Sequence, residues 1–216
     1  WTTGLRRMDY LFSDPGLVPP ERAALYSADL LFLPCLFNWT PPTGIVNVPL
    51  TGLPCLETGQ ITLGYGNEGF KLNQVLLASW AEMLRHLPHA RLALKFRGLE
   101  DPSLADHLRT RFQALGIGPE RLLLSGKTAH AAHVAWYGQV DLALDPFPYN
   151  GGVSTLEALW MGVPVVSLAG GTRASVSLLK GLQLAELLAE SRSDYVAKVI
   201  QLAQDPLRLL HYRQTL

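Results

Sequence analysis

The chain has 216 residues and a mass of 23.7 kDa, the size of one ordinary domain or of one domain with a fragment of its neighbour. Hydrophobic residues make up 48% of it, enough for a substantial core, and its 18 basic and 18 acidic residues cancel, which argues against a nucleic-acid binder because such proteins need a concentrated basic surface. Two cysteines are too few for a disulfide framework, so we expect a reducing, cytoplasmic location.

Residues 1–59 are predicted to be irregular and to form a connecting segment. Prolines interrupt every candidate element within a few residues, and one apolar run, Leu30–Leu33, is a candidate edge strand. The chain starts at Trp1 without an initiator methionine or a signal-peptide pattern, and no apolar run is long enough to cross a bilayer. We therefore expect a piece of a longer polypeptide with no membrane partner.

Residues 60–216 alternate short apolar strands with helical patterns, which is typical of crossover units around a parallel sheet. We predict an α/β fold with helices flanking a Rossmann-like sheet. Strands are predicted at Ile61–Leu63, Arg91–Phe96, Arg121–Leu124, Asp141–Leu144 and Val163–Leu168. Helices are predicted at Asn73–Leu87 with Asn73 as N-cap, after Asp101-Pro102, at Ala129–Tyr137, Val153–Met161, Thr172–Gly181 and Ser193–Gln204, and from Asp205-Pro206 onward.

Ligands of open parallel sheets bind outside the carboxyl ends of the strands, so the strand-to-helix loops are the candidate sites. The first such loop contains G-x-G-x-x-G at Gly64, Gly66 and Gly69, which is typical of a dinucleotide site when the helix begins within the motif. Here the helix is predicted to begin only near Asn73, so we favour a glycine-tolerant loop that presents Lys71. The Lys71 ammonium either neutralises a phosphate or is an ordinary solvated lysine.

The loop before the helix predicted at Val153–Met161 is a stronger candidate for an anion site. Two glycines allow close backbone approach, and the helix aims N–H groups and hydroxyls at one point; the residues concerned are Gly151, Gly152, Val153, Ser154 and Thr155. The alternative is a simple N-cap made by Ser154 or Thr155. Glu157, one turn later, suits the two hydroxyls of a ribose, although the helix macrodipole alone favours a glutamate there.

Two histidines, His130 and His133, share one face of the next predicted helix with Trp136. They either contact a nucleobase or simply pack or face solvent. Without a third ligand or a carboxylate at ligand spacing they do not indicate zinc, so no metal is expected.

Several segments together resemble the SPINDLY and O-linked N-acetylglucosamine transferase family. They are Met8-Asp-Tyr10, the stretch Asn67–Asn73 around Lys71, the long block Asp141–Val166, and Arg173-Ala-Ser175. The resemblance covers nearly the whole chain and the carboxyl-terminal half of that family's catalytic region. It implies the donor-binding domain of a GT-B glycosyltransferase, with a second Rossmann-like half and tetratricopeptide repeats elsewhere in the polypeptide, and it makes residues 1–59 the connection from that half.

The resemblance also implies roles for individual residues. Lys71 would be catalytic, stabilising the departing diphosphate, and Glu157 would bind the ribose. The implied donor-binding residues are Asn67, His130, His133, Gly151, Gly152, Val153, Ser154, Thr155 and Glu157. The implied reaction is an inverting, metal-independent transfer of a sugar, N-acetylglucosamine from UDP-GlcNAc as the first expectation and fucose from a GDP donor as another, to serine or threonine hydroxyls of a protein.

Two other functions stay open on the residues alone. One is an NAD(P)-dependent oxidoreductase that uses Gly64, Gly66 and Gly69, with Arg97 receiving a 2′-phosphate. The other is a non-catalytic nucleotide-binding or assembly module.

Overall fold

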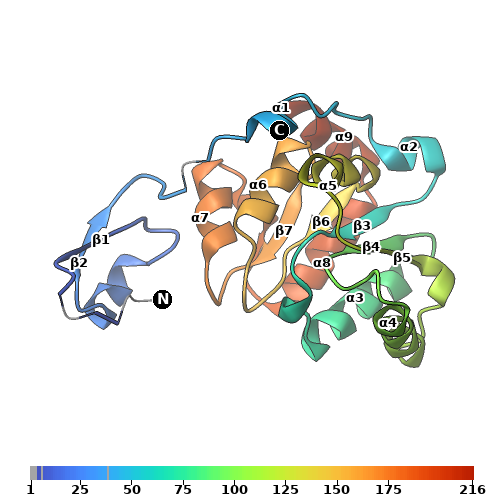
Figure 1. Ribbon diagram of the computed structural model, residues 1–216, viewed down its shortest axis with the longest axis horizontal. Helices are drawn as coiled ribbons and strands as arrows, with labels where there is room; N and C mark the ends of the chain where they lie inside the picture. Colours follow the sequence, from blue (N-terminus) through green and yellow to red (C-terminus); the bar gives the residue numbers. More distant parts are fainter. Residues whose placement is uncertain (1–3, 6, 38) are drawn as a thin grey trace.

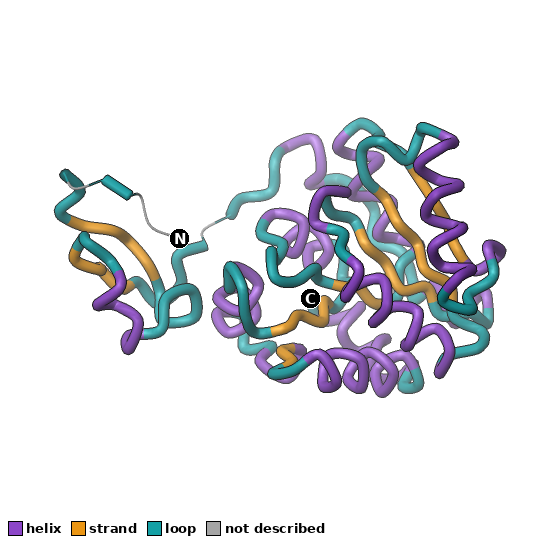
Figure 2. The backbone as a smooth tube through the Cα atoms, turned by 90° about the horizontal axis from the view of Figure 1, so that it is seen from below, coloured by secondary structure: helices purple, strands orange, loops and turns teal. Residues whose placement is uncertain are grey.

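A computed structural model describes residues 4–5, 7–37 and 39–216. The residue Trp1, on which we based the expectation of a longer polypeptide, and part of the proposed connecting segment lie outside these ranges. Within them the chain forms a small lobe near the N-terminus and a larger α/β domain (Figures 1 and 2). None of the described helices is long and apolar enough to cross a membrane.

The larger domain is built on a parallel sheet with the strand order β5-β4-β3-β6-β7-β8, which confirms the predicted α/β class. The strands are β3 (Thr62–Tyr65), β4 (Arg91–Lys95), β5 (Leu122–Ser125), β6 (Leu142–Leu144), β7 (Val165–Leu168) and β8 (Leu188–Ala189). All pairings between them are parallel. The chain order reverses between β3 and β6, which makes that place the topological switch point of the sheet.

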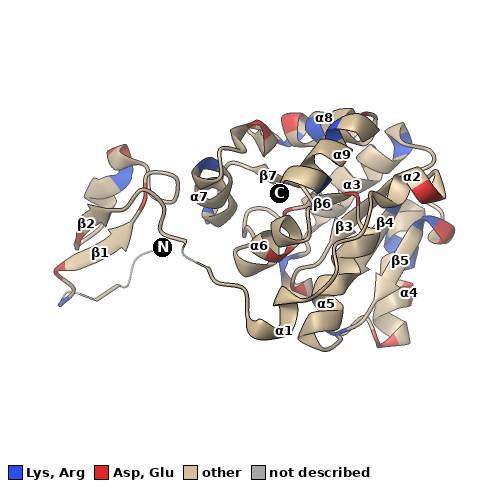
Figure 3. Cartoon of the chain, turned by 90° about the horizontal axis from the view of Figure 1, so that it is seen from above, with Lys and Arg blue, Asp and Glu red and all other residues tan. Residues whose placement is uncertain are grey.

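The segments between successive strands carry helices, which cover both faces of this sheet (Figure 1). The helices are α1 (Thr43–Val46), α2 (Pro54–Thr58), α3 (Gln74–His86), α4 (Pro102–Ala114), α5 (His130–Trp136), α6 (Val153–Trp160), α7 (Ala174–Gly181), α8 (Arg192–Ala203) and α9 (Pro206–Thr215). Short 3₁₀ turns are η1 (Pro20–Leu25), η2 (Gly69–Lys71), η3 (Pro119–Arg121), η4 (Tyr137–Gln139) and η5 (Ala185–Leu187). Acidic and basic positions are interspersed over the helices of this domain (Figure 3).

Local sequence signals explain where the main helices begin. Asn73 caps α3 by accepting a hydrogen bond from Leu76 N, and Asp101 caps α4 by accepting one from Ser103 N. Pro102 at the first position of α4 lacks an N–H that would have had no partner there. Both caps confirm the sequence prediction.

The core is packed between the sheet and the helix pair α3 and α8, which contact each other. Trp80 of α3, Tyr65 of β3 and Tyr195 of α8 are completely buried. The Trp80 indole donates a hydrogen bond of 3.4 Å to the Tyr195 hydroxyl, so the polar atoms of both rings keep a partner inside the core.

The small lobe contains a two-stranded parallel sheet of β1 (Tyr10–Ser13) and β2 (Asp29–Phe32). Asp14, after β1, is buried and accepts a hydrogen bond of 2.5 Å from the Ser177 hydroxyl on α7. The Arg173 guanidinium donates one of 2.8 Å to the Gly16 carbonyl. These polar contacts fasten the small lobe to the N-terminal half of α7.

The candidate edge strand at Leu30–Leu33 does form, as β2, and pairs with β1 in the small lobe. In two other places the structure corrects the prediction. The strand β1 lies in a segment that we predicted to be irregular, and β8 was not predicted at all. With only two residues, β8 is too short to give a recognisable hydrophobic period, whereas β1, which has four residues and pairs with β2, was simply not recognised among the prolines.

Candidate functional site

A cleft of about 460 Å³ opens over the carboxyl ends of the strands, beside the switch point between β3 and β6. The loops after β3, β4 and β5 and the start of α6 form its walls. Its lining residues are Gly66, Asn67, Glu68, Lys71, Lys95, Phe96, Arg97, Lys127, Thr128, His130, His133, Gly152, Val153, Ser154 and Glu157. Eight of the ten residues proposed from the sequence, Lys71 among them, therefore face one cavity.

Gly151 and Thr155, the other two proposed residues, are buried behind this cavity. The Gly151 N–H donates to an oxygen of Asp145 at 2.7 Å, and its carbonyl accepts from Ser175 at 3.0 Å. The Thr155 and Ser175 hydroxyls lie 3.2 Å apart. In this structure the polar groups of Gly151 and Thr155 support the start of α6 and do not line the cleft.

Asp145 organises the loop that leads into α6. Its carboxyl group accepts hydrogen bonds from the Asn150 amide at 2.7 Å and from the Ser167 hydroxyl at 2.6 Å. Burial raises the pKa of Asp145, while the bonds from Ser167, Gly151, Ser175 and Asn150 act in the opposite direction. This internal network fixes the backbone that presents the first turn of α6.

The first turn of α6 has free backbone donors. Its N-cap, Gly152, makes no side-chain capping bond, so the simple N-cap by Ser154 or Thr155 does not form. Within the described part of the chain, the N–H groups of Gly152, Val153 and Ser154 have no acceptor. A helix start of this kind attracts an anion through its free N–H groups and its macrodipole.

Lys71, on η2, lines the same cleft from the other side of the switch point. Its ammonium donates a hydrogen bond of 3.1 Å to the Asn150 carbonyl and lies 4.4 Å from the centre of the Tyr149 ring. Burial lowers the pKa of Lys71, although Asp145 and Glu68 act in the opposite direction. The lysine is thus a partly desolvated cation that is held next to the free amides.

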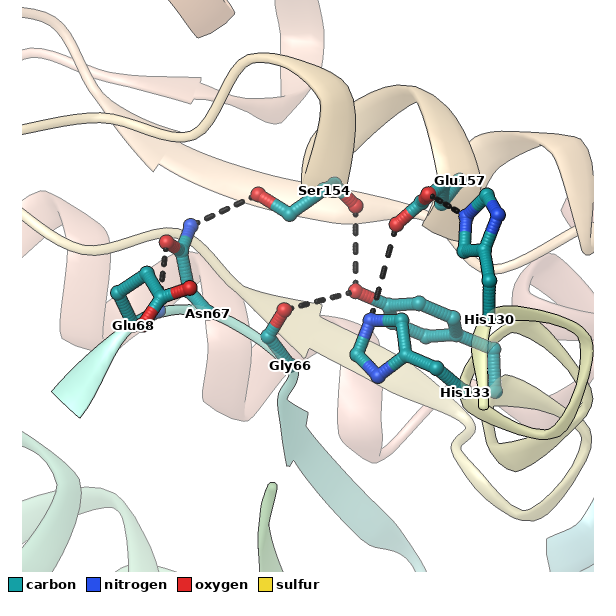
Figure 4. A network of polar contacts seen from close by, with 8 residues as sticks. Gly66, Asn67, Glu68, His130, His133, Ser154 and Glu157 are labelled. Atoms are coloured by element: carbon teal, nitrogen blue, oxygen red, sulfur yellow. Dashed lines mark hydrogen bonds and ion pairs between the residues drawn. The ribbon is translucent and has the colours of Figure 1, made fainter. Parts of the chain in front are cut away.

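Asn67 links the loop after β3 to α6. Its side-chain amide donates a hydrogen bond of 2.8 Å to the Ser154 hydroxyl (Figure 4). The Tyr137 hydroxyl donates to the Ser154 carbonyl at 3.1 Å and also contacts the Gly66 carbonyl at 3.4 Å. These contacts set the width of the cleft between its two main walls.

Glu157 is buried and contacts both predicted histidines, as Figure 4 shows. The distances from its oxygens are 2.6 Å to His130 Nε2 and 3.6 Å to His133 Nε2. Burial lowers the pKa of His133, with Glu157 acting in the opposite direction. The sequence analysis found no carboxylate for these histidines because Glu157 lies on another helix; even so, no metal-binding group of three or more such side chains occurs among the described residues.

The three glycines of the G-x-G-x-x-G motif serve packing. A Cβ on Gly64 would lie 2.4 Å from Val140, one on Gly66 would lie 2.6 Å from the Tyr137 hydroxyl, and one on Gly69 would lie 2.6 Å from Phe96. The next long helix, α3, begins only at Gln74. Side-chain packing therefore accounts for all three glycines, and α3 is too late to receive a pyrophosphate from this motif.

Several charged residues of the cleft were not predicted from the sequence. Lys95 at the end of β4 and Lys127 after β5 were not singled out, and Arg97 was considered only for a 2′-phosphate. With Lys71 these residues outnumber the acidic Glu68 and Glu157 in the cleft wall. The excess of positive charge fits a ligand with a net negative charge.

The strand order and the cationic cleft at the switch point define the class: a Rossmann-like α/β domain of the GT-B type. A solved structure of an O-GlcNAc transferase mutant from Thermobaculum terrenum matches 99% of this chain and 41% of that chain, with a TM-score of 0.88 and 36% identity. Sucrose-phosphate synthase from Thermosynechococcus elongatus shares the fold, with a TM-score of 0.63 and 14% identity over 98% of this chain and 55% of that one.

Residues 55–216 match Glycosyl transferase family 41, and the chain belongs to this family, which confirms the resemblance found in the sequence. The tomato (Solanum lycopersicum) protein described as a probable UDP-N-acetylglucosamine–peptide N-acetylglucosaminyltransferase SPINDLY is 35% identical over 100% of this chain and 23% of its own length. The protein of the same description from Arabidopsis thaliana is 33% identical over 100% of this chain and 24% of its own length. The chain thus corresponds to a minor part of these plant relatives.

Proposed function

We propose that this chain is the donor-binding part of a glycosyltransferase that transfers a sugar from a nucleoside diphosphate to serine or threonine hydroxyls of proteins. UDP-N-acetylglucosamine is the donor we consider first, because the plant relatives carry that donor in their descriptions. The observation that carries the proposal is the convergence of the Lys71 ammonium and the free amides of α6 at one end of the cleft.

The chemistry that these groups support is electrostatic. In an inverting transfer, the acceptor hydroxyl gives its proton to a base and attacks the anomeric carbon while the bond to the diphosphate breaks, and negative charge grows on the departing phosphate oxygen. The Lys71 ammonium and the N–H groups of Val153 and Ser154 offset this charge without a metal ion. One well-placed donor of this kind lowers a barrier by about 3 to 4 kcal/mol.

The other end of the cleft suits a nucleoside. Glu157 accepts hydrogen bonds, as a ribose diol requires, and in the free protein its oxygens face His130 and His133. Binding of a ribose would replace one of these contacts. We therefore place the diphosphate at Lys71 and α6, the ribose near Glu157, and the base toward the histidines.

The acceptor and its contacts belong to the rest of the protein in this proposal. We propose that residues 1–59 connect the domain to an N-terminal catalytic half, preceded by tetratricopeptide repeats. The small lobe supports this, because a two-stranded sheet is marginal by itself and β1 leaves Tyr10 and Phe12 more than half exposed. The unpaired cysteines agree with a reducing, cytoplasmic location.

Calorimetric titration of the full chain with UDP, GDP, ADP and NADP(H) tests the nucleotide class, with the variant Lys71→Met measured in parallel. We expect a uridine or guanosine diphosphate to bind, and to bind more weakly to the variant. A chain that binds only NADP(H), or no nucleotide at all, contradicts the proposal. Transfer of sugar to a protein by the complete polypeptide, lost in Lys71→Met, separates an enzyme from a non-catalytic nucleotide-binding module.

A further inference from the structure

The side chain of Lys95 is largely buried, and its ammonium reaches the cleft without a partner among the described residues. Lys95 is 4% exposed, ends β4 and lines the cleft. Among the described residues, no hydrogen bond or ion pair reaches its ammonium. Arg213, the other basic residue that is similarly buried, donates to the Met161 carbonyl at 2.8 Å, and Asp14 and Asp145 accept several hydrogen bonds each.

An ammonium on a largely buried side chain that lacks a partner is partly desolvated, and desolvation disfavours its charged form. This is the direction found here, since burial lowers the pKa of Lys95. Such a group in a cleft wall marks a position where a ligand supplies the missing acceptor.

The position of β4 in the sheet indicates which part of the ligand this is. The sheet order places β4 on the side of β3 that is away from β6 and α6. Lys95 pairs in register with Ser125 of β5, and the loop after β5 brings Lys127 and Thr128 to the same cleft. Lys95 therefore lies toward the end of the cleft opposite the free amides of α6.

Contacts on α5 agree with this placement. The Nε2 atom of His133 lies 3.6 Å from a carboxylate oxygen of Glu157. Burial is the main cause that lowers the pKa of His133, and the positive charge of Lys95 lowers it further. In the arrangement proposed above, the group that lies beyond the ribose at this end is the nucleobase.

We propose that the Lys95 ammonium donates a hydrogen bond to a carbonyl oxygen of the nucleobase, which makes Lys95 a specificity-determining residue. This inference rests on the proposed function, namely that the cleft binds a nucleoside diphosphate. Uracil offers O2 or O4 and guanine offers O6, whereas adenine carries an amino group instead of a carbonyl. An adenine nucleotide places an amino group, itself a donor, where uracil or guanine offers a carbonyl oxygen to the ammonium, so the site disfavours it.

The test compares Lys95→Met with Lys127→Met, in which an exposed lysine of the same cleft is removed. UDP, GDP, ADP and inorganic pyrophosphate are titrated into the full chain of each variant. We expect Lys95→Met to weaken the preferred one of UDP and GDP by about 10- to 100-fold and to leave ADP and pyrophosphate nearly unchanged. Lys127→Met should weaken all four probes by a similar small factor.

An equal loss of affinity for all four probes in Lys95→Met would show that the ammonium binds phosphate. Unchanged affinity for UDP and GDP would show that it binds neither phosphate nor base. Either result overturns the inference. Failure of the parent chain to bind any nucleotide would instead overturn the proposed function. Thermal unfolding without ligand serves as a second readout, because removal of an unpaired, partly desolvated charge should not lower the melting temperature. If Lys95→Met fails to fold, Lys95→Gln must show the same loss of selectivity between UDP or GDP and ADP.

Discussion

The ammonium nitrogen of Lys71 lies 3.1 Å from the carbonyl oxygen of Asn150, although the two residues are 79 positions apart in the sequence. This contact crosses the switch point and brings the loop after β3 against the loop that leads into α6. A neutral carbonyl is a weaker acceptor than a phosphate oxygen. The contact therefore holds the ammonium beside the free amides of Val153 and Ser154 and leaves it ready to exchange this partner for an anion.

Replacement of Lys71 by methionine should reduce sugar transfer far more than it reduces donor binding. The side chain keeps most of its length and loses the charge that stabilises the departing diphosphate, so we expect kcat to fall by about 100- to 1000-fold. Steady-state kinetics of the complete polypeptide measures this change. Lys180→Met, on the exposed side of α7, is the matched control and should keep the parent kcat. A variant at position 71 with unchanged kcat would remove Lys71 from the chemistry.

The sequence predicted the main domain well because its elements carry strong local signals. Asn73 marks the start of α3, whose apolar period follows it, and the Asp101-Pro102 pair marks the start of α4. The site loops follow from the rule that ligands bind at the carboxyl ends of parallel strands. The place of the cleft was therefore predictable before the structure was known.

Contacts between distant elements were not predictable in the same way. The pairing of Glu157 with His130 joins two helices that are separated by β6, and no local period reports it. Lys95 has the sequence appearance of an ordinary lysine at a strand end, and only its burial without a partner distinguishes it. Asp145 was seen as part of the family block, but its role in holding the α6 loop depends on Ser167, from the neighbouring strand.

His133 should make the stability of the chain depend on pH. Burial lowers its pKa below the ordinary 6.5; Glu157 and Glu68 oppose the shift, and Lys95 and His130 add to it. The unfolded chain therefore binds the proton first as the pH falls. The contribution of neutral His133 to the free energy of unfolding is fully present above pH 6.5. It is lost as the pH falls from 6.5 to the lowered pKa, and no further loss from this group occurs below that pKa.

Urea unfolding of the parent and of His133→Gln between about pH 8 and about pH 5 measures this contribution. The free energy of unfolding should decrease less in the variant than in the parent over this range. His89→Gln, which replaces an exposed histidine, is the control and should follow the parent. Parallel pH profiles for the parent and His133→Gln would contradict the prediction.

The two cysteines should react very differently with iodoacetamide. Burial, with a further contribution from Asp141, raises the pKa of Cys55 to about 12, and only the thiolate is a good nucleophile. Cys35 is half-buried and accessible in comparison. Mass spectrometry of the native chain near neutral pH should show one adduct, on Cys35, and none in Cys35→Ser, whereas the chain unfolded in urea should carry two. Rapid modification of Cys55 in the native chain would show that its environment is open.

Gly64→Ala should destabilise the fold whether or not a ligand is bound. The added Cβ would lie 2.4 Å from Val140, which is completely buried, and overpacking of this kind lowers the free energy of unfolding by about 1 to 3 kcal/mol. Gly44→Ala is the control, because a Cβ there meets nothing within 4 Å. The double variant Gly64→Ala/Val140→Ala should recover part of the loss, since the smaller side chain makes room for the new methyl group. If Gly64→Ala instead kept the parent stability and lost affinity for NADP(H), the glycine motif would be a dinucleotide site after all.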